Sequence, residues 1–257
     1  MADLYLGTAG WSYADWSGTF YPEGLPTAQY LHHYARHLSA VEIDSTFYAT
    51  PRVDVVSRWA AAVPEGFQFC PKMVRTVTHD KRLQGAEAET EAFLAVLAPL
   101  GAKLGPIVLQ FECSFDPGNI DALEGYLGKL PSEQRFAVEV RDRRWLGPPL
   151  YELLARTGVA LVLQDLHYMP RLDVVTTDFT YVRWIGNRDR VPGPFNRVVV
   201  DRGRELEWWA ERVFRWLSQG IRVYTFANNH YQGHAPATVA EFQAKLAAAQ
   251  AGEPSLG

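Results

Sequence analysis

The chain has 257 residues, of which 47% are hydrophobic and 21% are charged, and its formal net charge is −4. This composition is that of an ordinary globular protein, and the negative charge excludes a positive field of the whole molecule that would draw it to nucleic acid or membranes. The length is long for one ordinary domain but typical of one α/β barrel.

The chain starts with a strand pattern and ends in small, polar residues. The first ten residues lack a basic segment before their apolar residues, and no apolar run approaches the roughly 18 residues of a membrane span. We therefore expect a cytoplasmic protein with no membrane partner, and the two cysteines do not make a disulfide framework. Residues 247–257 are small and polar and are expected to form a flexible tail after a single domain over residues 1–246.

Short β-branched or aromatic runs alternate with helical patterns along the chain. Eight strands are predicted, starting near Leu4, Ala40, Phe67, Ile107, Phe136, Ala160, Phe179 and Arg222. Helices are predicted over residues 28–37, 53–62, 86–97, 120–130, 149–157, 205–218 and 236–249. This alternation predicts a parallel α/β sheet, and eight strands in this length predict closure into a single (β/α)₈ TIM barrel.

The sixth strand–helix unit is the weak point of the barrel prediction. Between Asp165 and Asp178 there is no room for a full crossover helix, so the barrel is expected to be irregular there. The alternative fold is a doubly wound open sheet, although no Gly-x-Gly-x-x-Gly or Walker run supports it.

Polar side chains alternate with apolar ones along the predicted strands. Val41 and Ile43 would pack against outer helices, so Glu42 and Asp44 are expected inside the barrel. The same test on the other strands predicts an inward ring made of Glu42, Asp44, Lys72, Gln110, Glu139, Arg141 and Arg183. Barrel interiors are usually apolar and unpaired buried charge is costly, so this ring favours a working site over a purely structural ion-pair network.

Three loops after predicted strands are strongly basic. Residues 72–82, 141–144 and 183–190 carry ten of the 25 basic residues of the chain. If the barrel forms, this rim should focus positive potential and suit phosphate or carboxylate, unless the cations pair with acids. Trp11 follows the first strand and could stack on a ligand ring, with ordinary packing as the alternative.

Several motifs resemble those of the domain-of-unknown-function 72 family, also called YecE-like. The motifs are GTAGWSY at 7–13, VEIDSTFY at 41–48, THDKRL at 78–83, VEVR at 138–141, YVR at 181–183 and NNHY at 228–231. The resemblance implies a TIM barrel and no established activity. Two positions depart from the family pattern, because Asp44 stands where Asn is more common and Ile185 where many members have His.

The candidate site residues follow from the ring and the rim. The catalytic candidates, which would supply acid/base chemistry, are Glu42, Asp44, Lys72 and Glu139. The substrate-binding candidates are Trp11, His79, Arg82, Arg141, Arg183, Asn228, Asn229 and His230. Lys72 has a Schiff-base role as its alternative. No cofactor is predicted, and a divalent metal is the alternative to that prediction, although no tight ligand motif such as His-Glu-x-x-His occurs.

Three functions fit these residues. The first is an enzyme, such as a hydrolase, that acts by acid/base chemistry on a small anionic ligand, with a nucleotide, nucleic acid or sugar phosphate as candidate substrates. The second is a glycoside hydrolase or sugar isomerase, for which the separation of Glu42 and Glu139 is diagnostic. The third is a non-catalytic binding protein, because a fold alone does not exclude it.

Overall fold

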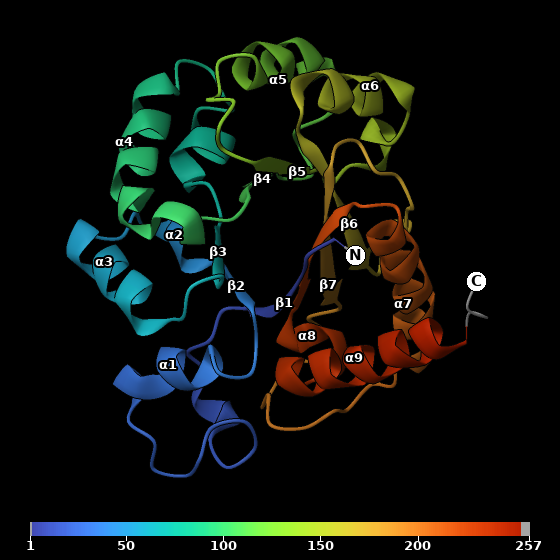
Figure 1. Ribbon diagram of the computed structural model, residues 1–257. Coiled ribbons are helices and arrows are strands. Elements are labelled where there is room, and N and C mark those ends of the chain that lie inside the picture. Colours follow the sequence, from blue (N-terminus) through green and yellow to red (C-terminus); the bar gives the residue numbers. More distant parts are fainter. Residues whose placement is uncertain (1, 253–257) are drawn as a thin grey trace.

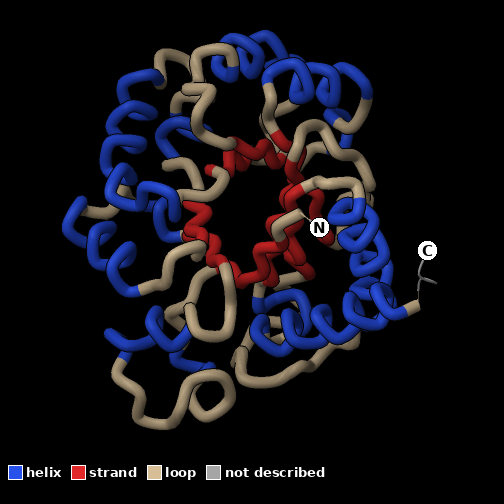
Figure 2. The backbone as a smooth tube through the Cα atoms, viewed as in Figure 1, coloured by secondary structure: helices blue, strands red, loops and turns tan. Residues whose placement is uncertain are grey.

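Eight parallel strands form the centre of the computed structural model, which describes residues 2–252 (Figure 1). The strands are β1 Leu4–Ala9, β2 Ala40–Ile43, β3 Gln68–Pro71, β4 Ile107–Gln110, β5 Phe136–Glu139, β6 Ala160–Leu166, β7 Phe179–Gly186 and β8 Arg222–Ala227. Their order in the sheet is β3-β2-β1-β8-β7-β6-β5-β4. Figure 2 shows the strands as a ring with the helices outside it, which confirms the predicted TIM barrel.

The seam of the barrel lies between β3 and β4. Two isolated parallel bridges cross it in place of a continuous ladder. Phe69 of β3 pairs with Leu104, which precedes β4, and Lys72, which follows β3, pairs with Val108 of β4. The amide of Met73 also donates to the Val108 carbonyl at 2.9 Å. The barrel is therefore closed here by fewer regular strand pairs than between β7 and β8, which are in register from Phe179 to Trp184.

Helices follow most of the strands and cover the outside of the barrel. They are α1 Tyr30–Tyr34, α2 Ser45–Tyr48, α3 Val53–Ala62, α4 Glu87–Leu97, α5 Ile120–Leu127, α6 Pro148–Thr157, α7 Gly203–Ser218, α8 Asn229–Gln232 and α9 Ala235–Ala251. No helix lies between β6 and β7, so the predicted irregularity of the sixth unit is confirmed. In residues 2–252 no helix combines the length and hydrophobicity that crossing a membrane requires.

The last helix extends into the segment expected to be a tail. Helix α9 continues to Ala251, so the expected domain boundary after residue 246 is too early. Residues 247–251 are three alanines, a glutamine and another alanine, which have a high helix propensity and extend the helix until Gly252. Residues 253–257 of the expected tail lie outside the described residues.

Aromatic rings from β7 and β8 fill the interior of the barrel toward the amino ends of the strands. Phe179, Tyr181, Tyr224 and Phe226 cluster with small or branched side chains of β2 to β6. The Tyr181 and Phe226 rings lie 5.0 Å apart between centroids. Large rings from one side thus meet small residues such as Ala40 and Ala137 from the other, and this layer supports the charged layer above it.

Candidate functional site

Two glutamates and one arginine form a buried ion network above the aromatic layer. Glu42 comes from β2, Glu139 from β5 and Arg183 from β7, and all three are almost fully buried. The Arg183 guanidinium donates to Glu42 Oε1 at 2.5 Å and to Glu139 Oε2 at 2.5 Å. Tyr181 donates its hydroxyl to Glu42 Oε2 at 2.8 Å. The strand parity inferred from the sequence therefore places these three charged side chains inside the barrel together.

The surroundings of the two glutamates shift their pKa values in opposite directions. Burial is the strongest influence on Glu42 and raises its pKa; Asp44 adds to this, and the adjacent Arg183 only partly opposes it. Burial would also raise the pKa of Glu139, but Arg141, Arg183 and Lys72 together lower it to about 2. Glu139 is therefore a permanent carboxylate at neutral pH, and Glu42 is the one that more readily accepts a proton.

A second tier of charged residues connects this network to the surface. Arg141 donates from Nε to Glu139 Oε1 at 2.5 Å, and its side chain is 15% exposed. Asp44 follows the end of β2, is 34% exposed, and lies 3.4 Å from Arg183 and 3.5 Å from the Lys72 ammonium. Lys72 also lies over the Phe47 ring at 4.9 Å. Because Lys72 is already paired with Asp44, the geometry favours an ion-pair role for it over that of a nucleophile.

A cavity of about 500 Å³ opens at the carboxyl ends of β6, β7 and β8, above these tiers. Its walls include Tyr13, Asp44, Arg141, Tyr168, Arg188, Phe195, Asn228, Asn229 and His230. This volume lies within the usual range for ligand pockets, and the carboxyl end is where TIM-barrel sites are found. We call this space the mouth cavity.

Arg188 differs from the other cations of the mouth cavity. Within residues 2–252 its guanidinium has no hydrogen bond or ion pair, whereas Arg141 is bound to Glu139 and to the Tyr168 hydroxyl. Arg188 lies on the long connection between β7 and α7, which has no helix of its own in the described chain. An unpaired cation beside a cavity is free to hold an anion.

Most other cations of the predicted basic rim are neutralised. Arg75 pairs with Asp80, Arg144 with Asp142, Lys81 with Glu89 and Arg82 with Glu112. Glu89 and Glu112 lie outside the three basic loops, so counting charges within those loops overestimated the positive potential. The rim is therefore less positive than the charge count of these loops predicts. Among the described residues, the loop cations without an ion pair are Arg143, Arg188 and Arg190, and Arg188 is the one of these three that lines the mouth cavity.

The predicted binding residues on α8 and its flanks lie together at the mouth cavity. Asn228 caps α8, because its side chain accepts from the His230 amide at 3.0 Å. His230 Nδ1 is 2.6 Å from the Val191 carbonyl, and the His230 and Phe195 rings are nearly perpendicular with centroids 4.9 Å apart. Asn229 is 3% exposed and its Oδ1 accepts from the Trp16 indole at 3.1 Å, so this residue mainly anchors the helix.

Four predicted binding residues lie elsewhere. His79 packs edge-on against Phe47 at 4.8 Å, and Arg82 donates to the Ser114 carbonyl at 2.8 Å; neither is among the residues that line the mouth cavity. Arg183 is not among the lining residues either, and its guanidinium is bound by carboxylates. Trp11 lines a separate, adjoining cavity. The sequence therefore placed Arg183 correctly inside the barrel, but did not show that its partners occupy it.

Tyr13, Tyr168, Arg188 and Phe195 were missed as site residues. Tyr13 is in the recognised GTAGWSY motif, and Arg188 is in a basic loop, so a signal was present for both. Tyr168 and Phe195 lie on connections without a regular period, and only the folded structure brings them to the mouth cavity.

Two alternatives from the sequence are less well supported by this geometry. Within the described range 2–252, no three His, Cys, Asp or Glu side chains come together to hold a metal. Asp165, one acidic residue near the predicted rim, accepts instead from Trp209 of α7 and Tyr231 of α8. For glycoside hydrolysis, a sugar would have to enter between the two glutamates, where the Arg183 guanidinium lies.

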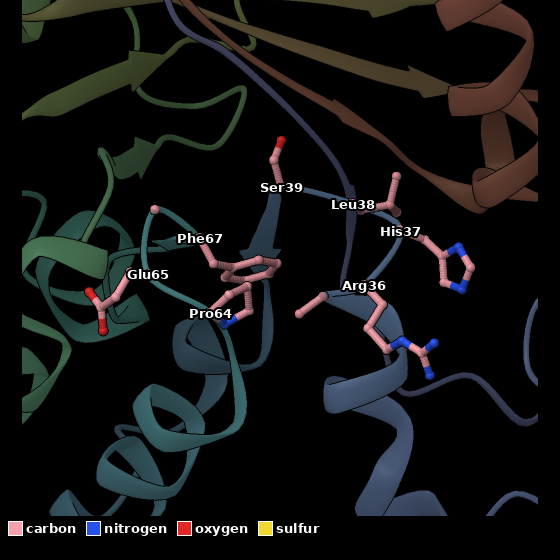
Figure 3. Close-up of a pocket in the computed structure, with 9 residues that line it drawn as sticks. Arg36, His37, Leu38, Ser39, Pro64, Glu65 and Phe67 are labelled. Carbon is pink, nitrogen blue, oxygen red and sulfur yellow. The ribbon is translucent and has the colours of Figure 1, made fainter.

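Another hollow of about 380 Å³ lies at the opposite end of the barrel (Figure 3). It is bounded by residues 35–39, which precede β2, and 64–67, which precede β3. Figure 3 shows the charged side chains of Arg36 and Glu65 on opposite sides, far from converging on one point. The hollow contains none of the predicted site residues, so the mouth cavity is the stronger candidate.

The chain is similar to known proteins over nearly its full length. A family model described as a protein of unknown function, DUF72, matches residues 5–256. UPF0759 protein YecE of Escherichia coli strain K12 is 34% identical, with 92% of this chain and 90% of that protein covered. The crystal structure of a DUF72 family protein, TM1631, from Thermotoga maritima MSB8 has a TM-score of 0.82 at 28% identity and covers 95% of this chain and 99% of that chain.

Proposed function

The chain belongs to the DUF72 family of proteins of unknown function, and from that premise we propose that its mouth cavity binds a small phosphate-bearing molecule. Family membership gives the fold and no reaction, so the proposal depends on the site itself. The observation that carries it is Arg188, an arginine beside a cavity of about 500 Å³ with no carboxylate partner in the described chain.

The neighbouring groups support an anion at this position. Arg141 is held by Glu139 through one side of its guanidinium and is still 15% exposed toward the cavity. Asn228 and His230 add polar groups at the same wall. Arginine suits phosphate because its planar fork can donate two parallel hydrogen bonds. The ligand would thus be held between two arginines from different strand ends.

Asp44 is the acid/base group that we assign to the reaction. It is the only one of the three candidate carboxylates that lines the mouth cavity, since Glu42 and Glu139 are fully buried. Lys72 and Arg183 flank it at 3.5 and 3.4 Å, and its carboxylate is the one that a ligand in the cavity can reach. Glu42 and Glu139 then position Arg183 and Arg141 and do not touch the ligand.

Calorimetric titration of the protein with inorganic phosphate and with ribose 5-phosphate tests the anion site. We expect saturable binding of one ligand per chain, weakened at least about tenfold in Arg188→Ala, because a lost charge-assisted hydrogen bond is worth about 1.5–3 kcal/mol. Arg190→Ala is the matched control, since Arg190 is on the same connection but outside the cavity lining. Binding that is absent, or equal in the wild type and Arg188→Ala, would overturn the proposal.

A non-catalytic binding role is the second candidate. The observation in its favour is that Glu42 and Glu139 are closed to solvent and saturated by arginines and Tyr181. Asp44→Asn distinguishes the two candidates once a ligand is known. An enzyme would keep the ligand bound and lose turnover, whereas a binding protein would show no turnover in either form.

A further inference from the structure

A smaller aromatic cavity adjoins the mouth cavity. It has a volume of about 290 Å³ and lies at the carboxyl ends of β1 and β2. Trp11 and Tyr13, from the connection after β1, and Trp59, from α3, line it. Tyr13 and Asp44 line both cavities, so the two spaces are neighbours that share these two side chains.

The aromatic cavity has walls that are held in place. The Trp11 and Trp59 rings are nearly perpendicular, at 86°, with centroids 5.5 Å apart. Trp59 also stacks over Phe69 at 6.3 Å, and the Tyr13 hydroxyl donates to the Ala9 carbonyl at 2.6 Å. A rigid aromatic wall binds a flat ring without ordering flexible side chains, which favours affinity.

The aromatic side chains of this cavity also keep free hydrogen-bonding groups. Within residues 2–252 the indole N–H groups of Trp11 and Trp59 have no hydrogen-bond partner. Ser12 and Ser45 add hydroxyl groups to the lining. A ring with polar edges would therefore find both a stacking surface and donors, unlike a purely aliphatic ligand.

We propose that one ligand occupies both cavities and that it is a nucleoside monophosphate, with its base against Trp11 and Trp59 and its phosphate beside Arg188. This inference rests on the phosphate site proposed above. Asp44 lies at the junction, where its carboxylate can accept hydrogen bonds from the sugar hydroxyls, as acidic residues do for ribose in dinucleotide-binding folds. Base stacking on aromatic side chains supplies the affinity that a sugar phosphate lacks.

The test compares ligands with and without a base. The wild type is titrated with AMP, GMP, CMP and UMP and, separately, with ribose 5-phosphate, and binding is followed by calorimetry and tryptophan fluorescence. We expect at least one nucleotide to bind about tenfold or more tightly than ribose 5-phosphate. Trp11→Ala should lower the affinity for that nucleotide to the affinity for ribose 5-phosphate. Trp11→Phe should keep most of the difference in affinity between the two ligands.

The outcomes separate this inference from the phosphate site. If nucleotides and ribose 5-phosphate bind equally, or Trp11→Ala weakens both alike, the base subsite is wrong, while sensitivity to Arg188→Ala would still support the phosphate site. If neither class of ligand binds, both proposals fail. Trp208→Ala, on α7 and outside both cavity linings, controls for the general effect of removing a tryptophan, and thermal unfolding verifies that each variant is folded.

Discussion

At the residue scale, Glu139 is a buried carboxylate that holds two arginines. It accepts from Arg183 at 2.5 Å and from Arg141 at 2.5 Å while fully buried. Removing one partner of a buried ion pair leaves charge uncompensated and commonly costs about 3–5 kcal/mol. We expect Glu139→Gln to lower the free energy of unfolding by about this amount at pH 7, measured by urea denaturation.

The same variant makes a prediction about pH. The pKa of Glu139 is lowered from 4.5 to about 2 by its arginines and Lys72, so its stabilising charge is fully present above about pH 4.5 and is lost as pH falls toward 2. The difference in free energy of unfolding between the wild type and Glu139→Gln should therefore become smaller as the pH falls from about 4.5 toward 2. Glu87→Gln, at the exposed pair with Lys129, is the control and should leave the free energy of unfolding nearly unchanged at both pH values, because solvent screens exposed pairs. A difference that is the same at pH 7 and pH 3 would contradict the assignment.

The sequence predicts which strand side chains point into the barrel, but it does not predict which charged side chains form ion pairs. The two-residue period of β2, β5 and β7 places Glu42, Glu139 and Arg183 inside the barrel, because one face of each strand must pack against helices. Which cations remain unpaired depends on distances between loops far apart in the chain, such as Arg82 and Glu112. That information is absent from local charge counts.

At the element scale, the contact between β7 and α8 positions the mouth residues. Gly186 ends β7 with φ at +77°, and a Cβ there would lie 2.3 Å from the His230 carbonyl oxygen and 2.5 Å from the Tyr231 Cα. Helix α8 has only four residues, so its place is set by this contact and by the Asn228 cap. The strand end and the helix therefore approach each other backbone to backbone, which only glycine permits.

Gly186→Ala should displace α8. Overpacking commonly costs about 1–3 kcal/mol, and the left-handed conformation adds about 1–2 kcal/mol for alanine, so a clear loss of thermal stability is expected together with weaker phosphate binding. Gly125→Ala, within α5 and with open space around it, is the control and should be neutral or stabilising. Unchanged stability and binding in Gly186→Ala would show that α8 is not held in this way.

The short helices were not predicted, because a four-residue helix has no measurable hydrophobic period. α2 and α8 both follow a strand directly and carry or flank site residues, namely Asp44 before α2 and Asn228 before α8. The long helices and the missing sixth helix were predicted, because they follow from apolar spacing and from the length of the connection. The last helix was predicted to residue 249 and ends at Ala251, but a flexible tail was expected from residue 247, because alanine-rich sequence has little amphipathic pattern.

At the scale of the whole molecule, different features of the sequence determine the fold and the site. The barrel follows from eight strands, their parity and the length of the connections. The mouth cavity is formed by connections after β1, β2, β5, β6, β7 and β8. Residues as distant as Tyr13 and His230 share its wall, so its shape and its free cation appear only when the barrel closes.

The proposed function requires that a phosphate group binds at the mouth cavity beside Arg188. The most direct measurement is a crystal structure of the protein grown with ribose 5-phosphate. We predict a phosphate within hydrogen-bond distance of the Arg188 guanidinium and close to Arg141, with the contacts between Arg183 and both glutamates unchanged. A mouth without the ligand while the phosphate occupies another part of the surface would contradict the account.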